Sequence, residues 1–469
     1  MNVSSRTGMA LAGLAIVGTG GRGGETAEEA LGGTAIASAE AAPPSDEIMT
    51  LTAVPSDVGS EEQLPDQVER VDLLTFAQGA LFVEQTGLAT GSATRALGMI
   101  DGDERKLVLT TDGKEPIELI YKMPANTTFD RFAIPNVLET PGNATFFKSV
   151  VISGSVEGPD TGYQILATAE LETHGPDQQV TELVPQVVTP VRWVKVNLEG
   201  GINIVEGDEG RTNLEFTEVV GNGTQDALPL STAFTGVWDF RLTERMDMKG
   251  QPLELHQTGA TITGCLSTVV INGTVNGRIA RATGFDTSNE RPSAFIFVAD
   301  EDDAIHAVMS VNRGRFGART AVVDPEVTAT ACSEAPPEPT FCGLSVYVNF
   351  DVNSAVIRPE SDQILSDLYA GLVADGVEQV SIEGHTSTEG TEQYNLDLSE
   401  RRAQAVVDDL VERGFDAGSI SAVGKGESEP LLRPDNDESS CSLNRRVEIK
   451  CGQEAEADRA ALGLTPVTR

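Results

Sequence analysis

The sequence predicts a multidomain protein. Two all-β domains, a jelly-roll-like sandwich and a small antiparallel sheet or barrel, are followed by an α/β sandwich of βαβαββ order. The chain has 469 residues, enough for about three domains of the usual size. Apolar and polar residues alternate at period two before Val323, whereas apolar residues recur at helical spacing only after Pro359. Long helices are therefore expected only in the last part of the chain.

The first 70 residues are expected to lie outside any globular domain. Residues 1–24 form a candidate signal segment, because Arg6 precedes a short apolar run at residues 8–17. The small-residue site Ala37-Ser38-Ala39 lies far from this run, so cleavage near residues 18–24 and a mis-assigned start codon are both open. No cysteine follows the run, and a lipid anchor is not predicted. Residues 25–70 have the composition of a disordered acidic leader.

Residues 71–223 contain many short strand-like runs separated by turn residues, a pattern typical of a β-sandwich. The expected strands are residues 117–121, 129–134, 149–153, 191–198 and 214–220. Their order resembles that of discoidin or galactose-binding-like domains. The resemblance implies that a turn such as Asp101-Gly102-Asp103 can hold a structural calcium ion and that loops at one end bind sugars. The tryptophan that commonly follows this turn is missing here. A plain spacer sandwich, in which Asp101 only stabilises its turn, is the alternative.

Residues 230–330 are expected to form the small β domain. The segment opens with Thr235-Gly236-Val237-Trp238, and hairpin turns such as Asn276-Gly277 separate runs of Val, Ile and Thr. This pattern predicts no particular function. A proline-rich linker at residues 331–341 follows and should be short and stiff.

Residues 342–453 are expected to form the α/β domain, with residues 454–469 as a tail. A half-buried strand is predicted at residues 345–350, and a helix begins near Pro359 and ends at Gly376. A second strand at residues 380–382 leads into a loop at residues 384–390. Thr391 should cap a long second helix that stops at Gly414 and turns Leu396, Ala403, Val407 and Leu410 inward. Strands near residues 420–423 and 446–450 complete the sheet.

Four motifs at fixed spacing lie within this last domain. They are Val380-Ser-Ile-Glu-Gly-His-Thr386, Gly390-Thr-Glu-Gln-Tyr394-Asn395, Leu398-Ser399-Glu-Arg-Arg402-Ala403 and Asn444-Arg445-Arg446-Val-Glu-Ile449. Together they resemble the OmpA-like peptidoglycan-binding domain of Gram-negative envelope proteins, over about residues 346–451. The resemblance implies non-covalent binding of peptidoglycan, in the periplasm or at the outer membrane. The β domains would then be presented to an envelope protein or a glycan.

The candidate binding residues follow from the motifs. Asn395, Ser399 and Arg402 are spaced i, i+4, i+7, so they share one helix face and can meet one ligand. An arginine fork suits the carboxylate at the diaminopimelate end of a peptidoglycan stem peptide. The full predicted set is Asp351, Thr386, Ser387, Asn395, Ser399, Arg402 and Arg446.

Two positions of this set and the neighbouring His385 leave questions open. The family usually has an aspartate where this chain has Ser387, and that acid would pair with the ligand ammonium. Asp351 or Glu389 could take its place. His385 is expected to cap or hydrogen-bond the loop rather than touch ligand. Arg446 either stabilises the site or pairs with a surface carboxylate.

Charge and cysteine content exclude some classes of function. With 72 acidic and 33 basic residues the formal net charge is −39, which disfavours nucleic-acid binding. The sequence has no apolar stretch of 18 residues, so no transmembrane helix is predicted. The five cysteines form no Cys-x-x-Cys pair, which argues against a metal site. Cys441 and Cys451 bracket the last strand, Cys265 and Cys332 could close the middle domain, and one cysteine is left over.

Two functions of different classes remain. The first is a non-enzymatic envelope protein that grips peptidoglycan. The second is a wall-docked glycan-binding lectin or adhesin, or an enzyme acting on glycan. An enzyme would need a paired acid and base or an activated nucleophile. The four histidines are dispersed and no Gly-x-Ser-x-Gly elbow is present, so the sequence favours a non-enzyme.

Overall fold

The computed structural model describes residues 70–461 apart from nine gaps. The gaps are residues 88–97, 103–115, 136–144, 172–179, 204–215, 287–290, 328–329, 331 and 333–339. The predicted signal segment, nearly all of the acidic leader and most of the proline-rich linker lie outside the described residues. No helix within the described ranges is long and apolar enough to cross a membrane.

The first β domain is built on a seven-stranded antiparallel sheet. Its strands are β1 (Leu81–Thr86), β2 (Ile117–Pro135), β3 (Thr145–Ser155), β4 (Gln164–Glu170), β5 (Val180–Leu183), β6 (Val191–Asn203) and β7 (Val220–Gln225). The strands predicted at residues 117–121 and 129–134 are one continuous strand, β2. It pairs with β1 and β6 through its first half and with β5 and β7 through its second, with a register shift between Lys122 and Thr127.

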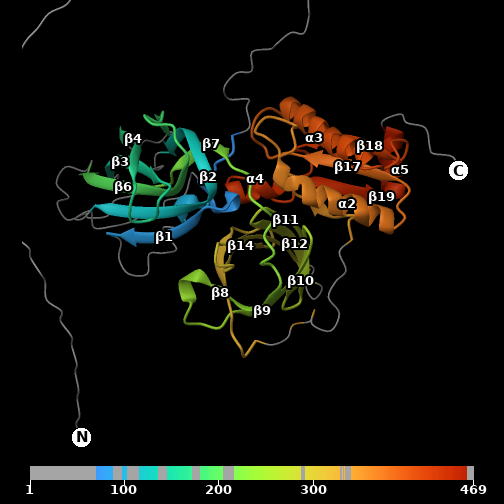
Figure 1. Cartoon of the computed structure of the whole chain (residues 1–469), viewed down its shortest axis with the longest axis horizontal. Coiled ribbons are helices and arrows are strands. Elements are labelled where there is room, and N and C mark those ends of the chain that lie inside the picture. Colours follow the sequence, from blue (N-terminus) through green and yellow to red (C-terminus); the bar gives the residue numbers. More distant parts are fainter. Residues whose placement is uncertain are drawn as a thin grey trace, which may run out of the picture. The chain divides into compact units, whose positions relative to one another are not determined.

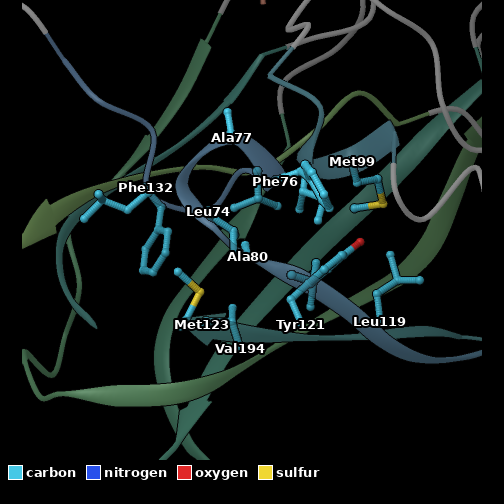
Figure 2. Close-up of a cluster of buried hydrophobic side chains, with 14 of the residues drawn as sticks. Leu74, Phe76, Ala77, Ala80, Met99, Leu119, Tyr121, Met123, Phe132 and Val194 are labelled. Carbon is cyan, nitrogen blue, oxygen red and sulfur yellow. The ribbon is translucent and has the colours of Figure 1, made fainter. Parts of the chain in front are cut away.

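The core of this domain follows from the alternation along β2. Leu119, Tyr121 and Met123 are buried on one face; between them Lys122 is partly exposed, whereas Ile120 is buried as well. Figure 2 shows them meeting Leu74, Phe76 and other apolar side chains from the segment before β1. One predicted strand was misplaced: residues 216–219 are irregular, and β7 begins only at Val220.

The second β domain is a closed eight-stranded barrel, which decides between the sheet and the barrel that the sequence left open. Its strands are β8 (Gly236–Leu242), β9 (Gln251–Thr258), β10 (Thr261–Leu266), β11 (Val269–Asn276), β12 (Ile279–Asp286), β13 (Arg291–Ala299), β14 (Ile305–Val311) and β15 (Gly317–Val322). Each pairs with the next, and β15 pairs with β8. Apolar side chains fill the interior, including Trp238, Phe240 and the stacked rings of Phe295 and Phe297, so the barrel encloses a packed core.

The C-terminal domain is a four-stranded sheet with helices packed against it (Figure 1). Its elements are β16 (Ser345–Val346), α2 (Asp362–Ala374), β17 (Val380–His385), α3 (Glu392–Glu412), β18 (Ile420–Gly426), α4 (Glu438–Asn444), β19 (Val447–Cys451) and α5 (Gln453–Ala461). The sheet order is β16-β19-β17-β18, and only β17 and β18 run parallel. Val380, Ile382, Val447 and Ile449 form the sheet side of a core shared with α2 and α3.

Several details of this domain differ from the sequence prediction. The first strand is only two residues long, although Phe350 makes an isolated bridge with Ile357. The short helix α4 and the helix α5, which lies in the predicted tail, were not anticipated. Leu396 is 40% exposed and does not point inward. The predicted cap is confirmed, because the hydroxyl of Thr391 accepts a hydrogen bond from the Tyr394 backbone N–H.

Two disulfide bonds lie within the described residues. Cys265 pairs with Cys332, as the sequence suggested, and Cys342 pairs with Cys451. The second bond joins the segment before β16 to the end of the last strand. Cys441 is therefore the odd cysteine; it is buried in α4, and its thiol lies 3.3 Å from the Asp435 carbonyl oxygen.

Candidate functional site

Arg402 lies on α3 and is held in place by two neighbours. Its Nε donates a hydrogen bond to the Ser354 carbonyl oxygen at 3.0 Å, and its guanidinium carbon lies 5.1 Å from the centre of the Phe350 ring. The second contact is a cation–π interaction. Only 7% of the residue is exposed, so Arg402 is not an ordinary solvated arginine of a helix surface.

Asn395 and Ser399 are fully buried on the same face of α3, and their hydrogen bonds go to the protein. The Asn395 amide donates to the Ser387 carbonyl oxygen at 3.2 Å and to the Glu427 carboxylate at 2.6 Å. The Ser399 hydroxyl accepts from the Gly426 N–H at 2.9 Å and donates to the Leu396 carbonyl at 2.7 Å. These side chains position the loop and the end of β18, and Arg402 is the one suited to meet ligand.

Gly384 allows α3 to approach the sheet closely at this point. A Cβ added to Gly384 would lie 2.2 Å from the Ser399 carbonyl oxygen, a distance that no side chain could tolerate. The glycine therefore brings the polar turn of α3 directly over the start of the loop at residues 386–390.

That loop contains a compact polar group. Ser387 is 1% exposed, and its hydroxyl lies 3.4 Å from a Glu389 carboxylate oxygen. Arg445 reaches both of them, with its Nη1 3.5 Å from the Ser387 hydroxyl and 3.4 Å from the Glu389 carboxylate. Its Nη2 bonds the Glu438 carboxylate. Thr386 is also buried, and its hydroxyl has no hydrogen-bond partner among the described residues.

The other two predicted residues lie in different surroundings. Asp351 has a 55% exposed side chain, 4.0 Å from the Arg358 guanidinium. Arg446 is buried and bonds the Glu448 carboxylate, with its Nε at 2.8 Å, and the Glu429 carbonyl at 2.9 Å. Arg446 therefore pairs with a mostly buried carboxylate and not with a surface one.

Glu383, His385 and Glu448 are the one group of three metal-ligand side chains that the described residues bring together. Their carboxylates already have cationic partners, since Lys425 lies 2.8 Å from Glu383 and Lys450 lies 2.8 Å from Glu448. Burial opposes ionisation of Glu448, but Arg446 and Lys450 outweigh it and lower the pKa of Glu448 to about 2. With Arg446 included, three cations face two carboxylates, so we assign the group to an ion-pair network and not to a metal centre.

His385 differs from its expected role. Both ring nitrogens are buried and lack a hydrogen-bond partner within the described part of the chain. Its backbone N–H, not its side chain, bonds to the Arg446 carbonyl at 2.9 Å. Burial is the main cause that lowers the pKa of His385 to about 3, followed by the charge of Arg446, so the ring is neutral at pH 7.

The calcium ion expected at Asp101 stays a prediction, since only part of the turn is described. The N–H of Gly102 donates to the Glu218 carboxylate at 3.1 Å, but Asp101 belongs to no described group of three ligand side chains. Asp103 lies outside the described residues.

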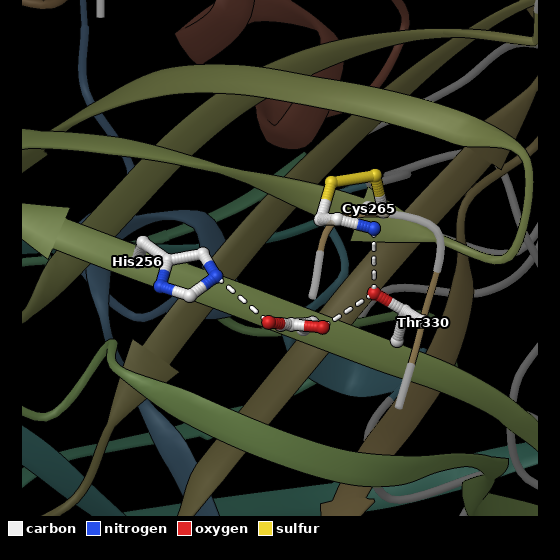
Figure 3. The surroundings of a disulfide bond; sticks show 5 residues. His256, Cys265 and Thr330 are labelled. Carbon is white, nitrogen blue, oxygen red and sulfur yellow. Dashed lines mark hydrogen bonds and ion pairs between the residues drawn. A yellow bond between two sulfur atoms is a disulfide. The ribbon is translucent and has the colours of Figure 1, made fainter. Parts of the chain in front are cut away.

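One histidine–carboxylate pair in the barrel domain has a hydroxyl nearby (Figure 3). The Glu254 carboxylate bonds His256 at 2.8 Å through one oxygen and the Thr330 hydroxyl at 2.5 Å through the other. A hydrolytic triad needs its nucleophile bonded to the base. Here the hydroxyl meets the carboxylate instead, beside the Cys265–Cys332 disulfide, so the group fits a structural role.

The fold defines the C-terminal domain as a small α/β domain, with the buried guanidinium of Arg402 on its long helix α3. Residues 349–443 match the OmpA family. The chain is 34% identical over 144 residues to the peptidoglycan-associated lipoprotein of Pseudomonas putida, covering 31% of this chain and 80% of that protein. The chain belongs to the OmpA family.

Other relatives share the same domain. Outer membrane protein A of Klebsiella pneumoniae is 42% identical over 119 residues, which is 23% of this chain and 34% of that protein. The chain thus spans about a third of that relative's length. The solved peptidoglycan-associated lipoprotein of Burkholderia pseudomallei is 30% identical, with a TM-score of 0.21, covering 23% of this chain and 89% of that one.

Solved structures similar to this chain also include a carbohydrate-binding module, CBM32-3, from a family 31 glycoside hydrolase of Clostridium perfringens. It is 13% identical, with a TM-score of 0.24, and covers 33% of this chain and 95% of the module.

Proposed function

We propose that the C-terminal domain binds peptidoglycan non-covalently, and that the chain is a non-enzymatic protein of the Gram-negative cell envelope, periplasmic or associated with the outer membrane. The ligand is the diaminopimelate end of a stem peptide, which carries a carboxylate and an ammonium. Membership of the OmpA family supports the proposal, and so do relatives whose names include peptidoglycan-associated lipoproteins. The two β domains serve structural contacts or bind an envelope partner.

The main observation in support of the proposal is the buried and anchored guanidinium of Arg402. Guanidinium groups bind carboxylates through two parallel charge-assisted bonds, and a partly desolvated site makes such bonds stronger. Arg402 is 93% buried and anchored through its Nε and the Phe350 ring. The ligand carboxylate would meet the outer edge of the guanidinium.

The test is co-sedimentation with purified diaminopimelate-type sacculi. The full chain should sediment, and a chain that ends at residue 339 should not. Arg402→Ala should lose most of the binding, since removing a desolvated arginine–carboxylate contact costs about 2–4 kcal/mol.

Arg401→Ala is the matched control, because Arg401 is the neighbouring arginine of α3 and is exposed. It should bind as the wild type does. A correctly folded Arg402→Ala protein that sediments like the wild type would remove Arg402 from the site and contradict the proposal.

A further inference from the structure

The cavity beside Arg402 is bordered by more than the C-terminal domain. It has a volume of about 130 Å³, and its lining includes residues of the segment before β1, of β7 and of the barrel. The barrel contributes Arg281, which lies on β12. A ligand of sufficient length can therefore meet Arg402 and the barrel in one space.

The side chain of Arg281 points away from the barrel interior. Its neighbours Ala280 and Ala282 belong to the interior core, and successive side chains of a strand point to opposite faces. Only 5% of Arg281 is exposed. Its Nη2 donates to the Ala77 carbonyl oxygen at 2.8 Å, and its Nε has no partner in the described part of the chain. A guanidinium carries five N–H donors, so this hydrogen bond leaves several of them for a ligand.

Arg281 forms no ion pair with a carboxylate of the described residues. Other arginines of the cavity each bond a glutamate: Arg358 bonds Glu360, Arg445 bonds Glu438, and Arg446 bonds Glu448. The charge of Glu438 also acts on Arg281, but its carboxylate is already bonded to Arg445 and Gln78. The cavity thus contains a buried guanidinium for which the described chain supplies no anion of its own.

A buried charge of this kind favours an anionic ligand. Removing an ion from water is costly unless another charge and hydrogen bonds compensate it. Burial, and then the charge of Arg445, lower the pKa of Arg281 to about 10, so the group is still a cation at pH 7. An anion in the cavity would provide the missing compensation.

Tyr347 adds a neutral donor to the same cavity. Its hydroxyl is buried and has no hydrogen-bond partner among the described residues. Burial raises the pKa of Tyr347, so the hydroxyl keeps its proton and can donate it to an acceptor. A guanidinium and a hydroxyl donor are the groups that a carboxylate accepts from.

We propose that Arg281 binds a second carboxylate of the peptidoglycan stem peptide in the cavity that Arg402 also lines, with the Tyr347 hydroxyl as a further donor. This inference rests on the proposed function. Diaminopimelate carries one carboxylate at the end of its side chain and one on its main chain. Arg402 takes the first and Arg281 the second, so the barrel completes the binding site of the C-terminal domain.

The test uses the full chain and two synthetic tripeptides that end in meso-diaminopimelate. One has its main-chain carboxylate free, and in the other that carboxylate is an amide. Amidation removes one negative charge and leaves the side-chain end intact for Arg402. Titration calorimetry on the wild type should show the free carboxylate bound about tenfold more tightly, the difference expected for one charge-assisted contact. In Arg281→Met the two peptides should bind about equally.

Arg278→Met is the matched control. Arg278 is another arginine of the barrel that donates to a backbone carbonyl, that of Ala299 at 2.8 Å, but it does not line the cavity. The control should keep the wild-type preference. Arg281→Gln is the second variant in case Arg281→Met does not fold, because it keeps an N–H donor and removes the charge.

Stability without ligand separates binding from a structural role. Arg281→Met should be at least as stable as the wild type in a denaturant titration, since an apolar side chain of similar length replaces a buried cation that lacks an ion pair. A less stable Arg281→Met protein that keeps the preference for the free carboxylate would assign Arg281 to holding the Ala77 carbonyl and overturn the proposal.

A free anion offers the same chemistry as a peptide carboxylate, so inorganic phosphate is titrated into the wild type and Arg281→Met. Phosphate binding that depends on Arg281, together with equal binding of the two peptides, would make a free anion the ligand and overturn the proposal. If the wild type binds neither peptide nor sacculi, the proposed function itself is wrong. If it binds both peptides equally, or if folded Arg281→Gln keeps the preference, the role of Arg281 is overturned while peptidoglycan binding stands.

Discussion

The side chain of Arg402 is ordered before any ligand arrives. A free arginine gives up about 2 kcal/mol of rotamer entropy when it is immobilised. Here the bond from Nε to Ser354 and the contact with Phe350 already restrict it. More of the energy of its carboxylate contact is then available for binding. For this reason we do not expect Arg402→Lys to bind as the wild type does. A lysine ammonium cannot bond both the Ser354 carbonyl oxygen and a ligand carboxylate with the geometry of a guanidinium.

His385 is expected to make the stability of the C-terminal domain depend on pH. Burial, with help from Arg446, lowers the pKa of its ring to about 3, whereas a histidine in an unfolded chain has a pKa of about 6.5. Between these values the unfolded state binds a proton that the folded state excludes. Stability is therefore complete above about pH 6.5 and falls as the pH decreases toward 3, by up to about 1.4 kcal/mol per pH unit.

Chemical unfolding of residues 340–461, followed by circular dichroism between pH 7 and 4.5, tests this dependence of stability on pH. His385 is the single histidine of that fragment, so His385→Gln should flatten the dependence. Glu448 acts at lower pH: its pKa is held at about 2, so its contribution is present above about pH 4.3 and is lost below it. Equal slopes in the two proteins would show that His385 is not the titrating group.

At the scale of elements, the sequence predicted what local patterns determine. Helical spacing and the flanking caps placed α2 and α3, and alternation placed β17 and β19. Which strand pairs with which is not determined by local sequence patterns. The strand β2 was divided in two because its middle contains Pro124 and the polar residues 126–128, although buried and exposed positions alternate through it. The helix α4 was missed because its helical segment is short and mostly polar.

For the candidate site, too, the sequence predicted only what local patterns determine. Arg402 was predicted because its motif has fixed spacing. The positioning roles of Asn395 and Ser399 were not, because a sequence shows that three polar residues share a face and cannot show that two of them bond the protein. Glu427 and Arg445 were missed as parts of the site for a related reason. Each is brought to the loop by a segment distant in the chain.

The N-cap of α3 ties the loop to the helix, and its removal should be measurable. Thr391→Ala loses the bond from the Tyr394 N–H to the hydroxyl. We expect the free energy of unfolding to fall by about 1 kcal/mol, the usual effect of losing a threonine cap. Thr391→Ser is the control and should be close to the wild type. Denaturant titration separates the two, and a stable Thr391→Ala protein would mean that water replaces the cap without loss.

For the whole molecule, the arrangement of charge matters more than its sum. The chain carries a net charge of −39, yet Arg358, Arg402, Arg445 and Arg446 line one cavity, together with Arg281 of the barrel and residues of the first β domain. Clustered charge in a cleft concentrates the field locally even when the rest of the surface has the opposite sign. An anionic group can therefore be attracted to this cavity by a protein that repels anions elsewhere.

The last prediction concerns where the C-terminal domain begins. The four motifs suggest a fragment from residue 346 to residue 451. Phe341 and Leu344 are nevertheless buried in the core of this domain, and Cys342 is bonded to Cys451. A fragment of residues 340–461 should unfold in one cooperative transition. A fragment of residues 346–461 should be less stable by several kcal/mol, since each lost apolar side chain costs about 1.5–3 kcal/mol and the lost disulfide about 2–5 kcal/mol.

The variant Cys342→Ser/Cys451→Ser in residues 340–461 separates the two causes. It keeps Phe341 and Leu344 and removes only the disulfide, so its stability should lie between those of the two fragments. Denaturant unfolding under non-reducing conditions gives all three values. If residues 346–461 matched the longer fragment, the segment before β16 would contribute nothing, and its burial would be a consequence of the fold rather than a cause of its stability.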